Sequence, residues 1–123
     1  MDLLPEDVKL VTLARASRAR TAAPQGAAVR DQDGRTYAAA TVTLPSLQVD
    51  ALDLAVAMAV SSGAQGLEGC AVVGGAVVGG AVVGGAVVGG EVPGIAAVRD
   101  LAGDGIAVVM ADEAGIPIEV VTT

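Results

Sequence analysis

The chain has 123 residues, the size of one domain, and 53% of them are hydrophobic, chiefly alanine and valine. Its formal net charge is −7 and Lys9 is its only lysine, so it lacks the clustered basic side chains that bind nucleic-acid phosphates. It has no histidine and one cysteine, which excludes a Ser-His or Cys-His nucleophile and an internal disulfide.

The N-terminal part of the chain predicts a helix followed by a β-hairpin. The helix is capped by Asp7 or a neighbour and extends to about Arg20, because alanine-rich sequence favours helix. A strand is predicted over residues 26–31, and Asp33-Gly34 turns the chain into a return strand over residues 35–42. The only basic cluster is expected on a solvated helix face: Arg15, Arg18 and Arg20.

A second helix is predicted over residues 47–61. Leu44-Pro45-Ser46 interrupts the preceding strand and can cap this helix, and Ser62-Gly63 ends it. Apolar residues recur at helical spacing and predict one buried face: Leu47, Ala51, Leu54, Ala55 and Met58.

The remaining elements alternate between strand and helix. A core strand is predicted over residues 67–73, where Cys70 is expected to be a buried, inert thiol. A helix follows over residues 95–102, and strands are expected over residues 106–110 and 116–122. The order α-β-β-α-β-α-β-β predicts an α/β fold in which helices cover a mixed sheet.

Three stretches resemble framework motifs of the cytidine deaminase family. Residues 23–29 read APQGAAV where the family has F-P-V-G-A-A-L, and residues 33–37, DGRTY, open the return strand. Residues 54–63, LAVAMAVSSG, are similar to the A-V-x-x-G ending of the family's zinc helix. The resemblance implies one three-layer α/β/α domain over residues 1–123, with a mixed five-stranded sheet, that assembles as a homodimer or homotetramer.

The resemblance also implies where the zinc site of the family would lie. The family holds zinc with a Cys or His of a C/H-A-E motif and with both cysteines of P-C-x-x-C, and its Glu transfers the proton. Those zinc positions fall on Asp50, Gly94 and Ala97, and the Glu position falls on Leu52. Gly and Ala have no donor atoms, and a catalytic zinc needs three protein ligands. We therefore predict no metal, no other cofactor and no catalytic residue, and interpret Asp50 as a helix-start residue.

The positions implied for substrate binding differ from the family as well. The ribose-binding N-x-E falls on Thr41-Val42-Thr43, and the Phe near the base falls on Ala23. A threonine can hydrogen-bond a ribose but cannot match the charge-assisted bond of a carboxylate. Whether a nucleoside pocket survives stays open.

Residues 71–90 repeat the sequence AVVGG four times. A phosphate loop is disfavoured because Gly80 stands where a lysine is needed. A membrane span is disfavoured because the tract is rich in glycine and has no basic anchor. Self-association through valine-rich strands is a third possibility. We favour a flexible loop insertion over residues 74–90, because loop tips accept added residues at small entropic cost.

The leading hypothesis is a pseudoenzyme, namely a cytidine-deaminase-like domain without zinc or deamination that has a structural, binding or regulatory role. One alternative is a nucleoside-modifying hydrolase that uses Asp50, Asp53 or Glu91, and another is a self-assembly module driven by the AVVGG tract. A cytoplasmic location is expected, because the acidic N-terminal segment lacks the basic region of an export signal and the chain has one cysteine. No membrane or nucleic-acid partner is expected.

Overall fold

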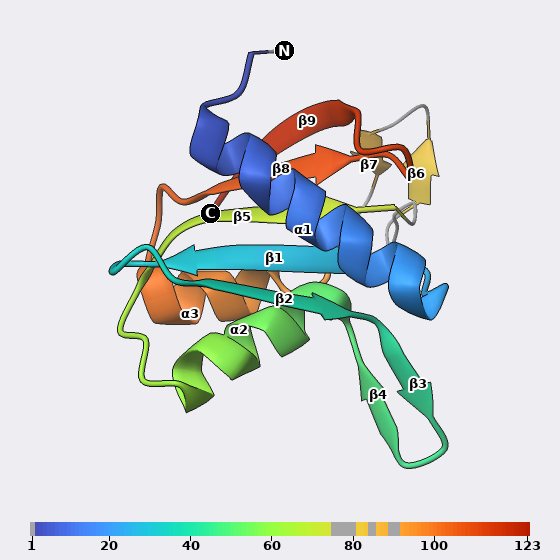
Figure 1. Cartoon of the computed structure of the whole chain (residues 1–123), viewed down its shortest axis with the longest axis horizontal. Coiled ribbons are helices and arrows are strands. Elements are labelled where there is room, and N and C mark those ends of the chain that lie inside the picture. The colour runs from blue at the N-terminus through green and yellow to red at the C-terminus, as the bar shows by residue number, and fades with distance from the viewer. Residues whose placement is uncertain (1, 75–80, 84–85, 89–91) are drawn as a thin grey trace.

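The structure is a computed structural model, and it describes residues 2–74, 81–83, 86–88 and 92–123. Its central feature is a sheet of five strands in the order β2-β1-β5-β8-β9 (Figure 1). The strands are β1 (Gly26–Asp31), β2 (Thr36–Ala40), β5 (Leu67–Val73), β8 (Ala107–Ala111) and β9 (Pro117–Thr122). Strands β5 and β8 are parallel and the other pairs are antiparallel, so the predicted mixed sheet is confirmed.

Helices cover both faces of this sheet, as Figure 1 shows. Helix α1 (Pro5–Thr21) lies on one face, and helices α2 (Ala51–Ser61) and α3 (Ile95–Ala102) lie on the other. The core beneath α2 and α3 contains no aromatic side chain that is fully buried, and its largest buried members are leucines, isoleucine, valines and a methionine. The three-layer α/β/α architecture implied by the resemblance is therefore confirmed.

Helix α1 packs on the sheet through a cluster of mostly small side chains, which we call the α1-facing cluster: Leu10, Val11, Ala14, Ala28, Ala71, Val73, Val109 and Ala111. The closest approach is at Gly26, the first residue of β1. A Cβ atom placed there would overlap the carbonyl oxygen of Ala14 and lie 2.9 Å from the backbone nitrogen of Arg18. Glycine at this position therefore lets the helix backbone rest directly on the strand.

Helix α1 begins earlier than the sequence indicated, and the predicted cap by Asp7 is wrong. Pro5 is its first residue, where the missing N–H of proline costs nothing, and Leu4 occupies the cap position without a side-chain hydrogen bond. Asp7 lies inside the first turn, where its charge is favourable near the helix N-terminus.

The predicted second helix is wrong over residues 47–50. Strands β3 (Val42–Leu44) and β4 (Leu47–Val49) pair as an antiparallel hairpin around Pro45-Ser46, and α2 starts only at Ala51. The buried face differs accordingly, since Leu47 and Met58 are exposed. The residues that α2 buries are Ala51, Leu52, Ala55, Val56 and Ala59.

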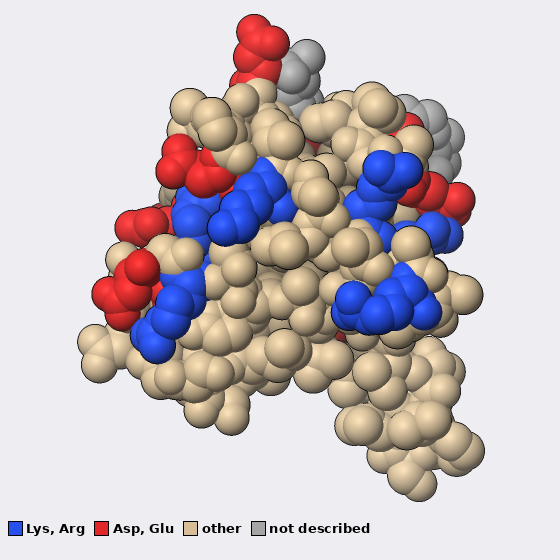
Figure 2. All heavy atoms as spheres, in the orientation of Figure 1, with Lys and Arg blue, Asp and Glu red and all other residues tan. Residues whose placement is uncertain are grey.

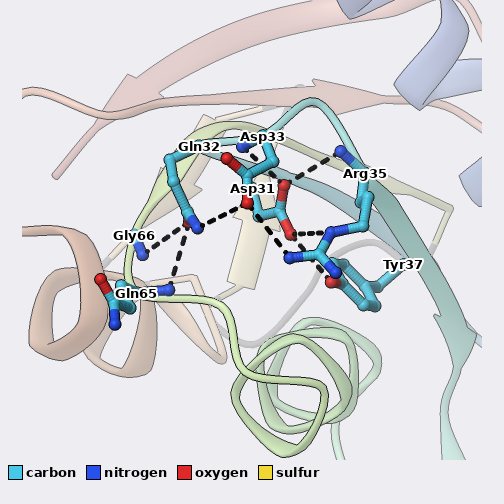
Figure 3. Close-up of polar contacts among 7 residues, drawn as sticks. All are labelled: Asp31, Gln32, Asp33, Arg35, Tyr37, Gln65 and Gly66. Atoms are coloured by element: carbon cyan, nitrogen blue, oxygen red, sulfur yellow. Dashed lines mark hydrogen bonds and ion pairs between the residues drawn. The ribbon is translucent and has the colours of Figure 1, made fainter.

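The predicted turn at Asp33-Gly34 is confirmed, and a buried carboxylate organises it (Figure 3). The Asp31 carboxylate accepts hydrogen bonds from the Tyr37 hydroxyl at 2.8 Å and from the backbone N–H groups of Asp33 and Arg35 at 2.9 and 3.0 Å. It also pairs with the Arg35 guanidinium at 3.2 Å. Burial alone would raise the pKa of Asp31, but these hydrogen bonds and the arginine charge outweigh it, and the pKa is lowered.

This lowered pKa predicts a loss of stability in acid. Because the folded pKa lies below the ordinary value of 3.8, the contribution of Asp31 is fully present above that value and is lost as the pH falls through the lowered one. Asp31→Asn is expected to be less stable than the native chain at neutral pH and to show a shallower decline in acid, measured by urea unfolding. Asp33→Asn, in the exposed part of the same turn, is the matched control and should retain the native pH profile. Parallel pH profiles for Asp31→Asn and the native chain would contradict this role.

Part of the AVVGG tract is described. Strand β5 ends at Val73, as predicted, and strands β6 (Ala81–Val83) and β7 (Ala86–Val88) pair in antiparallel fashion within the tract. The rest of the predicted insertion, residues 75–80, 84–85 and 89–90, lies outside the described residues, so its flexibility stays a prediction. Within the described ranges, no helix has the length and apolar character needed to cross a membrane.

Candidate functional site

The first turns of α2 and α3 meet at one junction, which is where the resemblance implied a metal site. Gly94 holds the cap position of α3 with a left-handed φ of 99°, a conformation that favours glycine. A Cβ atom at Gly94 would lie 2.6 Å from the Cβ of Leu52 and 2.9 Å from the backbone nitrogen of Asp53. Leu52 is 1% exposed, so its hydrocarbon side chain fills the space beside the start of α3.

The other two positions implied for zinc, Asp50 and Ala97, lie on the same two helix starts. Asp50 precedes α2 at its cap position, is exposed and makes no side-chain capping hydrogen bond. Its predicted place at a helix start is confirmed. Ala97 lies in the first turn of α3, is half-buried and packs against the core.

These residues do not fit a zinc ion. Asp50 is the only one of the three implied ligand positions with a donor atom, and Leu52 presents only carbon to the junction. In the described part of the chain, no three His, Cys, Asp or Glu side chains come together in a group that could hold a metal. A hydrolytic zinc needs three protein ligands, so Asp50, Gly94 and Ala97 cannot hold one by themselves.

The alternative of a nucleoside-modifying hydrolase depends on two further carboxylates, those of Asp53 and Glu91. Asp53 lies in the first turn of α2 and is half-buried, and burial, followed by the nearby Asp50 carboxylate, raises its pKa. Glu91 lies outside the described residues. The structure thus brings Asp50 and Asp53 into one helix start, and among the described residues neither carboxylate has a hydrogen bond or an ion pair.

A cavity of about 300 Å³ opens beside this helix start, between the β3–β4 hairpin and Asp50. Its lining contains the positions implied for ribose binding, and it combines hydroxyl, amide, carboxylate and apolar groups: Thr41, Val42, Thr43, Gln48, Val49 and Asp50. Its volume is at the lower end of the range typical of small-molecule pockets. The cavity could therefore accept a small polar molecule.

Thr41 is already engaged by the backbone at the start of β1. Its hydroxyl accepts a hydrogen bond from the Gln25 N–H at 3.1 Å and donates one to the Gln25 carbonyl at 3.3 Å. Gln25 is 7% exposed, and its Nε2 has no hydrogen-bond partner among the described residues. No sequence pattern singles out Gln25, because a buried amide at the start of a strand has no pattern of its own.

Cys70 and the arginine cluster take no part in this site. Cys70 is 1% exposed, and burial raises the pKa of its thiol to about 12, which confirms the buried, inert thiol predicted for it. Arg15 and Arg20 are exposed on α1, while Arg18 pairs with Glu113 at 3.2 Å. The solvated helix face predicted for this cluster is confirmed at Arg15 and Arg20.

Comparisons with known proteins point to one family. The family model described as cytidine deaminase-like matches residues 3–115. Among solved structures, the chain is similar to the cytidine deaminase from Burkholderia pseudomallei, with 22% sequence identity and a TM-score of 0.69 over 93% of this chain and 90% of that one. At this identity the likeness shows the fold alone. The comparison with curated proteins gives no match.

Proposed function

Because the chain belongs to the cytidine deaminase-like family, we propose that it is a member that keeps the fold without zinc binding or deamination. Such a protein has a structural, binding or regulatory role in the cytoplasm. The observation that supports this proposal most directly is the contact between Leu52 and Gly94, where the family pattern requires a carboxylate and a thiolate.

The chemistry of deamination explains why this contact supports the proposal. The reaction needs a metal-bound hydroxide and an acid–base group that moves its proton to the substrate. Leu52 cannot transfer a proton, and Gly94 and Ala97 cannot bind a metal. Thr43 stands where the family has its ribose-binding carboxylate. With Leu52, Gly94 and Ala97, it makes four positions at which the side chain lacks the group that the family uses.

We expect purified protein to contain far less than one zinc ion per chain and to leave cytidine and deoxycytidine unchanged. Elemental analysis measures the zinc, and the loss of the amino group is followed by ultraviolet absorbance. A zinc-dependent cytidine deaminase purified in the same way is the control for both measurements. Stoichiometric zinc together with turnover would overturn the proposal.

The cavity beside Asp50 supports a second candidate, a domain that binds a nucleoside without converting it. Thr43, Gln48 and Asp50 line this cavity and can hydrogen-bond a sugar. This candidate requires millimolar cytidine to raise the melting temperature, since a ligand that binds only the folded state must stabilise it. An unchanged melting temperature would exclude nucleoside binding and leave a structural role.

A further inference from the structure

Helix α1 covers only part of its face of the sheet. It packs chiefly on β1, β5 and β2 and only lightly on β8, while α2 and α3 share the opposite face (Figure 1). Neighbouring strands lie about 4.8 Å apart and a helix is about 10 Å wide, so one helix covers about half of a five-stranded sheet. Among the described residues, the strip of this face at β9 therefore has no helix over it.

The uncovered strip is apolar. Val120 of β9 pairs with Val109 of the α1-facing cluster, so both side chains point to the same face, yet Val120 is 41% exposed. A hollow of about 220 Å³ lies between α1 and the start of β9, and we call it the α1–β9 groove. Its lining is entirely apolar: Leu3, Val8, Val11, Gly115 and Pro117. Val8 is 48% exposed, so the helix side of the groove is open to solvent as well.

The size of this groove indicates the kind of molecule that fits it. It is smaller than the cavities of about 300 Å³ or more that enclose small molecules, so it suits one or two side chains of a larger partner. The strip beside α1 also has room for one helix. An amphipathic helix that inserts its apolar face is a common occupant of such a groove.

Charge determines the outer face expected of that helix. Residues 8–22 contain no acidic side chain, although the whole chain has a net charge of −7. Figure 2 shows basic side chains gathered over α1 on this face of the molecule. The basic residues of this part of α1 are Lys9, Arg15, Arg18 and Arg20. A partner that carries carboxylates beside its apolar side chains is therefore complementary to this surface.

Arg15 lies at one end of the groove and is the cation best placed to meet such a carboxylate. Its Cδ would be 3.2 Å from a Cβ atom at Gly115, one of the lining residues. The acids of the adjoining turn are already engaged, since Glu113 pairs with Arg18 at 3.2 Å and Asp112 accepts two backbone hydrogen bonds at 2.9 Å. Within the described part of the chain, Arg15 itself has no hydrogen bond or ion pair.

We propose that the α1–β9 groove binds an amphipathic helix of another protein, with apolar side chains in the groove and a carboxylate paired with Arg15. A second copy of this chain fits less well, because a two-fold contact through α1 would bring the same cations together. The groove lies on the opposite face of the sheet from Leu52 and Gly94. The interaction is therefore independent of whether the chain binds zinc.

The charge complementarity is tested by fluorescence anisotropy with two designed helical peptides. Both carry leucines on one face, and the other face carries glutamates in the first peptide and lysines in the second. Despite its net charge of −7, the native chain is expected to bind the glutamate peptide about tenfold more tightly. Arg15→Glu should abolish this preference, whereas Arg20→Glu, in the last turn of α1, is the matched control and should keep it. Equal affinities, a preference for the lysine peptide or no binding of either peptide overturns the proposal.

The apolar contact is tested with Val8→Ser combined with Val120→Thr. This variant is expected to bind the glutamate peptide about tenfold more weakly, because two apolar contacts are lost. The matched control, Leu44→Ser with Leu47→Ser on the β3–β4 hairpin, removes side chains of similar exposure and should bind as the native chain does. Circular dichroism melting verifies that each variant is folded. Equal affinities of the two double variants would contradict the proposed groove.

Two further measurements distinguish other occupants of the groove. Light scattering gives the mass of the particle, and sedimentation with phosphatidylserine-containing vesicles measures binding to a membrane. Both results are expected to be the same for the native chain and for Val8→Ser with Val120→Thr. A native dimer that dissociates in this variant, or vesicle binding that is lost in it, would assign the groove to a second copy or to a lipid surface and overturn the proposal.

Discussion

Replacement of Gly26 by alanine is expected to remove a large part of the stability of the protein. The new Cβ would overlap the Ala14 carbonyl oxygen and press on the Arg18 nitrogen, and both atoms belong to the backbone of α1. No side chain can rotate away, so α1 must rise from the sheet and open gaps throughout the α1-facing cluster. The cost is roughly 3 kcal/mol or more, against a total of about 5–15 kcal/mol for a typical domain. Urea unfolding followed by circular dichroism measures the loss, because the chain has no tryptophan.

Gly66→Ala is the matched control for this experiment. A Cβ at Gly66 meets nothing within 4 Å, so this variant is expected to remain within about 0.5 kcal/mol of the native chain. If Gly26→Ala were as stable as Gly66→Ala, the close contact between α1 and β1 would be contradicted.

Leu52→Glu, which places the family's acid–base group at its implied position, is expected to destabilise the protein strongly without creating activity. Leu52 is 1% exposed and packs among apolar side chains, so the introduced carboxylate would lack a partner. Burial of an uncompensated charge costs roughly 3 to 5 kcal/mol. The measurement is the free energy of unfolding, together with a deamination assay that should remain negative.

The pH dependence identifies the cause of this loss. Burial raises the pKa of the introduced carboxyl, so the folded variant binds a proton more tightly than its unfolded chain does. The deficit relative to the native protein should be largest above that raised pKa and should shrink as the pH falls below it. Leu52→Met, which nearly conserves volume, should cost less than about 1.5 kcal/mol at every pH. A deficit for Leu52→Glu that does not change with pH would show that altered packing, and not charge, causes it.

Much of the fold could be predicted because local patterns determine it. The strands over residues 26–31 and 67–73 and the helix over residues 95–102 were predicted with the bounds that the structure has. The β3–β4 hairpin was missed because Leu47, Ala51 and Leu54 match a helical spacing, and Pro45-Ser46 is typical of a helix start. The mirrored alternation of apolar and polar residues on either side of Pro45-Ser46 was the signal of a hairpin.

The sequence predicted which residues lie at the candidate site but not which of their side chains touch. The resemblance brought Asp50, Leu52 and Gly94 to two helix starts, and the structure places those starts together. The contact between Leu52 and Gly94 joins residues far apart in sequence, so no periodicity indicates it. The buried amide of Gln25 could not be predicted either, because Gln25 is held by hydrogen bonds to Thr41, which is distant in sequence.

The packing of Leu52 against Gly94 also restricts the mutational routes open to this sequence. A side chain at position 94 collides with Leu52 and must adopt a left-handed backbone conformation, while a carboxylate at position 52 is left in hydrocarbon. A glutamate at position 52 keeps the Cβ atom and leaves the Asp53 backbone nitrogen in place, so it does not make room for a side chain at position 94. Each single substitution toward the family's zinc motifs at these two positions is therefore expected to lower the stability of the chain, and the two losses are expected to accumulate.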